Sequence, residues 1–461
     1  MKKNYLLTVI FIISFISFST NAQQDVFSRS DAGTGDWGSA NEPWYYQTSN
    51  NNQGDPDNDN TIRNFIKIGH NNNTTMTTNG RYYRFETLDF QTGASSQRTI
   101  NNSSGGLSAS GGIYNLSTAT HTFNTPIGID GATVQLNANS SGGLTFTETI
   151  FINANTVNFG GSGSGNIIVN GTIQGTGNVN KTGGNTLTIS GSNTYSGTTT
   201  VSAGTMVLNS NIIDSDVTVN NGATLQISEN ATISSLTINA GGIVIIDTSK
   251  SLTISNNFTN NGSATAHHGS SLLVGGTSTG DITYNVDVTD TDWHLISSPV
   301  DGEQYDDAWV TANGIVSGSN NNRGISTYDN DVADTNNGGS DTATGHWRYF
   351  QADDVSASTF EAGVGYSLKG NGSDDYSFTG AIQNDAVSPK ISQGATNWNL
   401  IGNPYAAYLD IDLFLAENTT TNNVLAPPFQ AIYVWNGSGY DPITADDDSH
   451  IYPGQAFFCK L

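Results

Sequence analysis

The stretch that decides the fold reads Asn166-Ile-Ile-Val, Asn185-Thr-Leu-Thr-Ile, Gly204-Thr-Met-Val-Leu and Gly222-Ala-Thr-Leu-Gln-Ile. Its apolar anchors follow one another at intervals of 20, 19 and 19 residues, at Ile167, Leu187, Met206 and Leu225. A second series repeats at intervals of 18 and 19 residues, at Val201, Val219 and Ile238. Within each run apolar and polar residues alternate with period two, which is typical of β-strands. Two series with one period predict coils that return to the same face at every turn.

We therefore expect an all-β chain whose residues 101–284 form a right-handed parallel β-helix. Leucine, isoleucine, valine and methionine would fill its core, and threonine, serine and asparagine would face water. Residues 101–165 hold shorter alternating runs, which we interpret as earlier and less regular coils. After Val274 the last coil is expected to end near Tyr284.

One segment of this stretch resembles a known family. Residues 178–208 contain Lys181-Thr-Gly, Leu187-Thr-Ile-Ser-Gly, Asn193-Thr-Tyr-Ser-Gly and Gly204-Thr-Met. In this order they resemble the autotransporter-associated β-strand repeat over almost its whole length. The resemblance implies an exported, passenger-type β-helix on a bacterial surface, and it carries over no catalytic residues.

Composition limits the class of protein. The 461 residues leave room for two or three domains, and only 12% of them are charged. The net charge is −25, from 40 acidic and 15 basic side chains, which argues against nucleic acid and anionic membranes as partners. The single cysteine, Cys459, excludes an internal disulfide framework.

Residues 1–22 have the pattern of a secretory signal peptide. Lys2 and Lys3 precede an apolar run from Leu6 to Phe18, and Thr20-Asn21-Ala22 is a small-x-small cleavage site. The run is short for a membrane anchor. We expect an exported mature chain that begins at Gln23 and has no transmembrane helix.

Residues 23–100 differ from the solenoid in being rich in aromatic residues. The tryptophans at Trp37 and Trp44 followed by Ile66-Lys-Ile-Gly-His70 are similar to the first segment of many secreted bacterial β-helix proteins. A solenoid must cover its open end to protect backbone donors and the core. We expect this region to be an N-terminal cap.

Residues 285–461 carry a different internal repeat. Trp293-His-Leu-Ile-Ser-Ser-Pro recurs as Trp398-Asn-Leu-Ile-Gly-Asn-Pro, and the pattern from Phe360 to Lys369 recurs from Ile451 to Lys460. Short strands between Gly, Asn and Asp turns predict an antiparallel β-sandwich of two related halves. The Trp398 motif and Pro453-Gly-Gln-Ala-Phe-Phe resemble a module of type IX-secreted bacterial surface proteins.

In that repeat, Lys369 is followed by another strand-like run at Tyr376-Ser-Phe-Thr-Gly, whereas the sequence stops one residue after Lys460. We interpret this as a module truncated at its last strand, in a longer protein that continues into a sorting domain.

Two enzyme classes are common on β-helices. A pectate-lyase-like site for a polyanion needs cationic groups, but between Arg98 and Arg323 the only lysines or arginines are Lys181 and Lys250. A hydrolase needs a pair of carboxylates about 6.5–9.5 Å apart. Asp214 and Asp216 could form such a pair, although a turn-capping role is favoured for them.

The metal candidate is Asp55-Pro-Asp57-Asn-Asp59, whose alternating carboxylates offer oxygen ligands to Ca²⁺. It lacks the glycine and distal glutamate of an EF-hand loop, and an ordinary solvated turn is the alternative. No other cofactor is expected, and no His-Glu-x-x-His or Gly-x-Ser-x-Gly motif is present.

Aromatic side chains in the segment 285–461 could stack on sugar rings. Trp293 and Trp398 lie inside the duplicated strand motifs, which favours core packing for both. Trp309 and Trp347 lie outside those motifs and are the candidate ligand-binding residues.

Two functions follow. The favoured one is an exported cell-surface or secreted protein with a structural or adhesive role and no catalysis, in contact with an extracellular glycan or protein. The alternative is a polysaccharide-binding or polysaccharide-degrading protein that uses the β-helix groove or the C-terminal sandwich.

Overall fold

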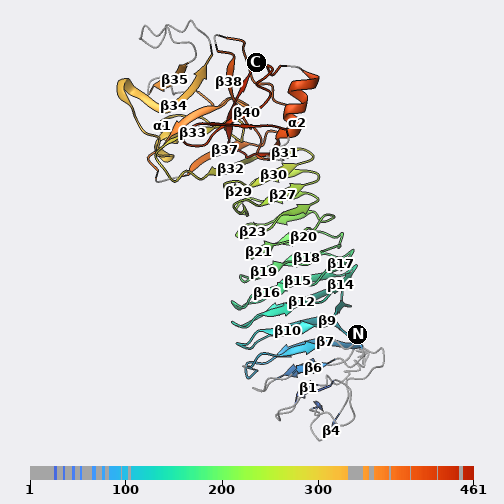
Figure 1. The fold of residues 1–461 in the computed structure, drawn as a ribbon. Helices are drawn as coiled ribbons and strands as arrows, with labels where there is room; N and C mark the ends of the chain where they lie inside the picture. Colours follow the sequence, from blue (N-terminus) through green and yellow to red (C-terminus); the bar gives the residue numbers. More distant parts are fainter. Residues whose placement is uncertain are drawn as a thin grey trace, which may run out of the picture.

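The computed structural model describes residues 82–330 except 95 and 102–104, and residues 346–461 except 352–357, 373–374, 395, 423 and 446–449. Before residue 82 it describes only the backbone of six short strands. The fold is all-β apart from short helical segments. A column of parallel coils carries a module of antiparallel sheets at one end (Figure 1).

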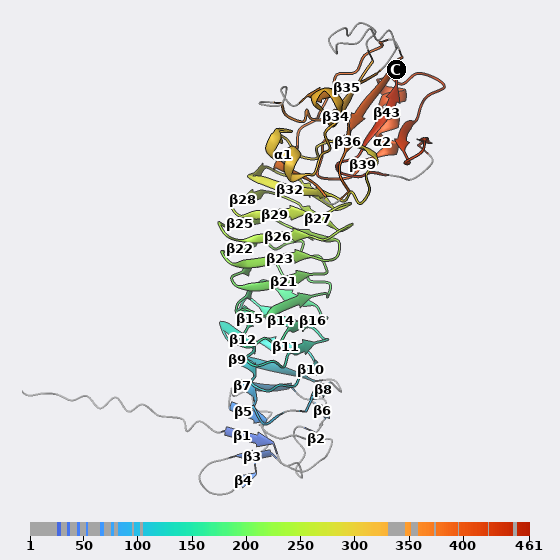
Figure 2. The same cartoon turned by 90° about the vertical axis from the view of Figure 1, so that its left-hand side faces the viewer.

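Each coil contributes strands to two long ladders, which lie on different sides of the column (Figure 2). We call them ladder A and ladder B. In the part of the chain under description, ladder A stacks β5 (Phe65–Ile68), β7 (Tyr82–Phe90), β9 (Gly106–Asn115), β12 (Thr133–Ala138), β15 (Thr156–Gly160), β18 (Val179–Lys181), β20 (Thr199–Val201), β22 (Val217–Val219), β25 (Leu236–Ile238), β28 (Phe258–Asn260) and β31 (Ser278–Thr279).

Ladder B stacks β2 (Gly35–Asp36), β6 (Thr75–Thr77), β8 (Thr99–Asn101), β10 (His121–Asn124), β13 (Leu144–Phe146), β16 (Ile167–Val169), β19 (Thr186–Ile189), β21 (Gly204–Leu208), β23 (Ala223–Ile227), β26 (Ile243–Ile246), β29 (Ser263–Ala266) and β32 (Asp281–Val286).

A third side of the column is built from shorter ladders. Early coils supply β11 (Ile127–Ile129), β14 (Ile150–Asn153) and β17 (Ile173–Gly175), and late coils supply β24 (Ala231–Ile233), β27 (Ser251–Ile254) and β30 (Ser271–Val274). At the other end, β1 (Asp25–Ser28) pairs parallel with β5 and antiparallel with β3 (Trp44–Tyr46), which pairs with β4 (Asn52–Gln53). Parallel stacking therefore reaches into residues 23–100.

The predicted register is confirmed. Leu187 lies opposite Met206, and Met206 lies opposite Leu225, in adjacent strands of ladder B. The second series is also confirmed, because Val201, Val219 and Ile238 are register partners in ladder A. Period-two alternation puts all of these side chains on the inside of the column, where they are fully buried or nearly so.

The core is one continuous stack of side chains along the column. Phe123 and Phe146 lie one above the other with ring centroids 5.0 Å apart and nearly parallel planes. Each fully buried aliphatic or aromatic side chain of this kind contributes about 1.5–3 kcal/mol of burial free energy. The solenoid needs no disulfide because this stack and the backbone ladders hold it together.

Glycine stands at or just before the start of two strands of ladder B for a conformational reason. Gly204 and Gly222 have φ values of 66° and 74°, which side chains rarely adopt. A Cβ atom on Gly204 would also lie 2.5 Å from the carbonyl oxygen of Asn185 in the coil below. These turns can therefore be tight only because the residue is glycine.

After β32 the chain forms two antiparallel sheets, as predicted. The first has the order β33 (Trp293–Ile296), β36 (Tyr366–Lys369), β34 (Asn322–Asp329) and β35 (His346–Gln351). The second has the order β38 (Trp398–Gly402), β43 (Ala456–Lys460), β40 (Ile432–Trp435) and β41 (Tyr440–Ile443). Residues 287–461, which contain both sheets, are called the C-terminal module below.

The sequence repeat is also a structural repeat. Trp293 lies opposite Lys369 in the first sheet, and Trp398 lies opposite Lys460 in the second. Each half also holds a short helix after its first strand, α1 (Asp307–Ala312) or α2 (Ile411–Ala416), capped by the side chain of Asp306 or Asp410. These helices were not predicted. A small additional pair joins β39 (Leu409–Asp410) to β42 (His450–Ile451).

The two halves contact each other reciprocally. The backbone N–H of Ser297 donates to Gly454 at 3.0 Å, and that of Gly402 donates to Gly363 at 3.1 Å. Gly402 is the counterpart of Ser297 in the repeat, and Gly363 is the counterpart of Gly454. The halves are therefore related as the two subunits of a symmetric dimer would be, within one chain.

The C-terminal module covers the end of all three sides of the column. Strand β37 (Tyr376–Ala381) pairs antiparallel with β32 along its whole length and so extends ladder B. On the third side Leu272 N–H donates to Ala406 at 2.6 Å, and on ladder A the Asn384 amide donates to Ser278 Oγ at 3.0 Å. Covering these rungs satisfies backbone groups that a solenoid end leaves open.

Candidate functional site

The outer edge of ladder B carries a column of polar residues, each at the end of a strand or directly after it. Asn124 Nδ2 donates to Asn101 Oδ1 at 2.8 Å, and Thr147 Oγ1 donates to Asn124 Oδ1 at 2.8 Å. Further along, Asn209 Nδ2 reaches Ser190 Oγ at 3.5 Å. These bonds run along the column axis, so the polar surface ties each coil to the next one.

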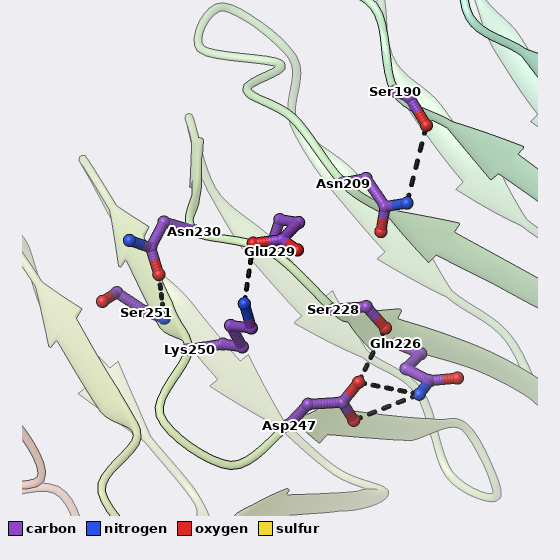
Figure 3. A network of polar contacts seen from close by, with 9 residues as sticks. All are labelled: Ser190, Asn209, Gln226, Ser228, Glu229, Asn230, Asp247, Lys250 and Ser251. Atoms are coloured by element: carbon purple, nitrogen blue, oxygen red, sulfur yellow. Dashed lines mark hydrogen bonds and ion pairs between the residues drawn. The ribbon is translucent and has the colours of Figure 1, made fainter.

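Figure 3 shows the best-connected part of this surface. Asp247 accepts hydrogen bonds from Gln226 Nε2, at 2.9 and 3.1 Å, and from Ser228 Oγ at 2.7 Å. Lys250 and Glu229 form an ion pair of 2.7 Å between neighbouring coils (Figure 3). The charged groups here are engaged with each other or with neighbouring polar side chains.

The repeat segment 178–208 folds its signature residues inward. Lys181 is fully buried, and its Nζ donates to the carbonyl oxygens of Thr182 and Gly183 at 2.8 Å, to Asn185 Oδ1 at 3.1 Å and to Ala203 O at 3.2 Å. Burial lowers the pKa of this amine to about 8. The lysine therefore satisfies backbone carbonyl groups in the turns of two successive coils, and we call it the internal cap.

The Asn-Thr-Tyr-Ser-Gly turn of the same segment is also structural. Tyr195 is buried, and its hydroxyl lies 2.7 Å from Thr199 Oγ1, which lies 2.7 Å from Ser215 Oγ. Burial raises the pKa of Tyr195 to about 12. Asn193 Oδ1 accepts the backbone N–H of Ile173 in the coil below at 2.9 Å. The motif therefore specifies stacking, and these residues are not exposed to a substrate.

A pocket lies at the junction between the solenoid and the C-terminal module. We call it the junction pocket. Its volume is about 250 Å³, and its wall includes the turn at His268, the end of β32, strand β33, the end of β40 and the loop before β43. Side chains that reach it include His268, His294, Trp435, Tyr452 and Gln455. The pocket exists only because segments up to 188 residues apart in the sequence meet here.

The polar groups around the junction pocket have defined partners. His268 Nδ1 accepts the backbone N–H of Asp287 at 3.1 Å, and His294 Nε2 lies 2.8 Å from Asp290 Oδ1. The Asp287 carboxyl contacts that of Asp375. Partial burial and this carboxyl raise the pKa of Asp375, while His267 and His268 oppose the shift. One carboxylate, Asp287, therefore lines the pocket, and Asp290 and Asp375 contact the lining residues His294 and Asp287.

The structure places the two predicted ligand-binding tryptophans in packed surroundings. Trp309, on α1, is only 7% exposed, its Nε1 donates to Ser377 O at 2.8 Å, and its ring contacts Phe360 and Phe378. Trp347, on β35, is partly buried against Tyr328 and Phe458. A sugar could stack on Trp309 only if the core around it opened.

Of the two predicted carboxylate sites, only the Asp214 and Asp216 pair lies among the described residues. Asp214 and Asp216 are both exposed and flank buried Ser215 in the turn before β22. Asp55, Asp57 and Asp59 lie outside the described residues, so the Ca²⁺ site there stays a prediction. Among the described residues no group of three or more His, Cys, Asp or Glu side chains has the geometry to hold a metal ion.

Periodicity could not have revealed the junction pocket, because none of its polar residues belongs to the two apolar anchor series. One sequence signal was available: the two halves of the C-terminal module differ at Gln455 and Tyr452, where the first half has Val364 and Glu361. Such divergence within a shared strand framework marks positions that have different surroundings.

These features define a class: a parallel β-solenoid that is closed at one end by a duplicated antiparallel module. The passenger-associated-transport-repeat family matches residues 179–208, the segment with the Lys181 cap. A domain of unknown function, DUF8693, matches residues 208–452, more than half of the chain, and the chain belongs to this family. No curated protein and no solved structure matches the chain.

The family match spans the last solenoid coils and most of the C-terminal module together. This agrees with the extensive contacts between the two parts. Within the described part of the chain, no helix has the length and apolarity needed to cross a membrane.

Proposed function

We propose that this chain is an exported cell-surface or secreted β-helical protein with a structural or adhesive role and no catalytic activity. The observation that carries the proposal is the passenger-associated-transport-repeat at residues 179–208, set within a solenoid of stacked coils. The solenoid is a stiff spacer, and the C-terminal module at its end is the part that is displayed or attached.

The mechanism follows from the outer face of the solenoid. Its threonine, serine and asparagine side chains repeat with every coil, so a partner with repeated polar groups can form many weak contacts at once. Such contacts add through effective concentration even when each is weak. The partner is an extracellular glycan or protein, and the net charge of −25 disfavours nucleic acid.

Several parts of the proposal rest on sequence pattern. Residues 1–22 act as a signal peptide, residues 23–100 cap the free end, and the coils are right-handed. Residues 285–461 serve as a sandwich module of the kind found in type IX-secreted outer-membrane surface proteins. The Asp55–Asp59 loop is the place to look for Ca²⁺.

Surface exposure is tested by labelling one cysteine on intact cells. Ser164 is exposed in a solenoid turn, whereas the natural Cys459 is buried, so the unchanged chain is the control. With a membrane-impermeant maleimide, we expect Ser164→Cys to be labelled before lysis and the unchanged chain not to be. Labelling of Ser164→Cys only after lysis would overturn the proposed location.

Absence of catalysis is tested with a panel of neutral and acidic polysaccharides. The proposal expects no release of reducing ends or unsaturated products from any of them. Turnover of one polysaccharide would replace the structural role by an enzymatic one.

A further inference from the structure

The junction pocket has the size and position of a binding site for a small ligand. Its volume of about 250 Å³ lies just below the roughly 300–1,000 Å³ that is typical of pockets for drug-sized molecules. A single sugar ring is of suitable size, whereas an extended chain is not. The site is at the junction of two structural units, where pockets are often found.

Aromatic and polar side chains share the lining. Trp435 is half-buried and packs against Tyr440 with ring centroids 5.1 Å apart, which fixes its orientation. Tyr452 is 50% exposed and contacts the ring of Tyr408, whose hydroxyl is bound to the solenoid at Gly269 O. Aromatic faces carry negative charge density and attract the C–H groups of a pyranose ring.

The polar groups are held in place by the protein. Because His268 Nδ1 accepts a backbone N–H, its Nε2 carries the proton in the neutral ring and is a donor. Gln455 Oε1 accepts the backbone N–H of Tyr452 at 3.2 Å, which orients that amide. Oriented donors and acceptors beside an aromatic platform are what hydroxyl groups of a sugar require.

Charge selects among sugars. Asp287 lines the pocket, Asp290 and Asp375 contact the lining residues His294 and Asp287, and the chain as a whole has a charge of −25. A uronate, sialate or sulfated sugar would be repelled. A neutral sugar meets no such penalty.

The other half of the C-terminal module provides an internal comparison. It keeps the strand register but replaces Tyr452 by Glu361 and Gln455 by Val364, and Val364 packs against the hydrophobic core. Of the lining residues, Tyr452 and Gln455 are therefore specific to the second copy, whereas His294 comes from the first copy.

We propose that the junction pocket binds one terminal residue of a neutral glycan, with Trp435 and Tyr452 as the platform and His268, His294 and Gln455 as hydrogen-bonding groups. This proposal deepens the proposed adhesive role. It rests on the proposed export only because export is what brings the chain to an extracellular glycan. Binding itself is a property of the purified chain.

The test is saturation-transfer NMR and calorimetry on the full purified chain with glucose, galactose, mannose, N-acetylglucosamine and galacturonate as separate probes. We expect at least one neutral sugar to bind and galacturonate not to bind. Trp435→Ala and Gln455→Val should each weaken binding by about tenfold or more. Gln455→Val introduces valine, which the other half of the module carries at the equivalent position, Val364. An unchanged melting temperature would show that this variant folds.

The matched control is Glu361→Gln in the other half, which should leave binding unchanged. The proposal is overturned if none of the neutral sugars binds, if galacturonate binds as well as they do, or if neither pocket variant weakens binding. Absence of sugar binding would not affect the result of the surface-labelling experiment, so each of the two proposals can be refuted without the other.

Discussion

Thr283 in the last solenoid strand lies directly opposite Thr379 of β37, and their hydroxyl oxygens are 3.0 Å apart. These two residues are 96 positions apart in the sequence and mark where the direction of pairing changes from parallel to antiparallel. The C-terminal module is thus joined to the solenoid through a shared sheet, in addition to the covalent connection. Its attachment should therefore contribute to the stability of the last coils.

A substitution at Gly380 in β37 tests this junction. A Cβ atom there would lie 2.1 Å from the carbonyl oxygen of Asp301, which pairs with the neighbouring Ala381. Backbone must shift to accommodate it, so Gly380→Ala should destabilise the protein by about 1–3 kcal/mol in chemical denaturation. Gly439→Ala is the control, because no atom lies within 4 Å of its added Cβ. Equal stability of the two variants would show that the close approach of Gly380 to Asp301 beside the β32–β37 pair contributes nothing.

A second prediction concerns the buried lysine of the repeat. Lys181→Met removes the donor for three backbone carbonyl groups and for Asn185, and these would be left unsatisfied inside the column. The expected loss is roughly 2–4 kcal/mol of unfolding free energy. Lys250→Met breaks only the exposed pair with Glu229 and should cost less than about 1 kcal/mol. If both variants lost the same amount, the internal cap would have no special role.

Acid stability provides a third prediction, through buried His121. Burial, followed by the charge of Arg98, lowers the pKa of His121 to about 3 from its ordinary 6.5. Its Nδ1 accepts the backbone N–H of Arg98 at 3.2 Å and its Nε2 lies 2.9 Å from Ser117 Oγ, so the neutral ring is already satisfied.

Between pH 6.5 and 3 the unfolded chain therefore binds a proton at this residue that the folded chain does not. Stability should fall as the pH drops through this window, by up to about 1.4 kcal/mol per pH unit from this residue alone. His121→Gln removes the titration, so its unfolding free energy should depend less steeply on pH than that of the unchanged chain. Parallel pH profiles for the two proteins would contradict the assignment.

Much of the fold could be predicted because stacking leaves a repeated mark on the sequence. The 19-residue spacing of Leu187, Met206 and Leu225 predicts their register, and the recurrence of the Trp293 motif at Trp398 predicts two related antiparallel sheets. The helices α1 and α2 were missed because each is only six residues long, too short for a helical period to be recognised.

The site was harder to predict for a different reason. Trp309 lies outside the duplicated motifs, but position relative to a motif does not determine burial, and its indole packs into an aromatic cluster with Phe360 and Phe378. The junction pocket depends on the meeting of the segments that carry His268, Asp287 and Tyr452, which no local pattern links. The junction pocket lies where the solenoid and the C-terminal module meet, and the periodic signal of the sequence is weakest there.

The central claim is that the coils stack in register into a rigid rod, and spin-label distances test it most directly. Outward-facing Thr122, Val207, Ile245 and Thr265 belong to one column of register partners in ladder B, with Val207 four, Ile245 six and Thr265 seven strands from Thr122. Strand spacing of about 4.8 Å predicts separations of about 19, 29 and 34 Å.

Cysteine pairs at these positions can be labelled selectively because Cys459 is buried. Double electron–electron resonance should give three narrow distributions whose means increase linearly with the number of strands. Broad distributions, or means that do not follow the strand count, would contradict the stacked rod and the functional account built on it.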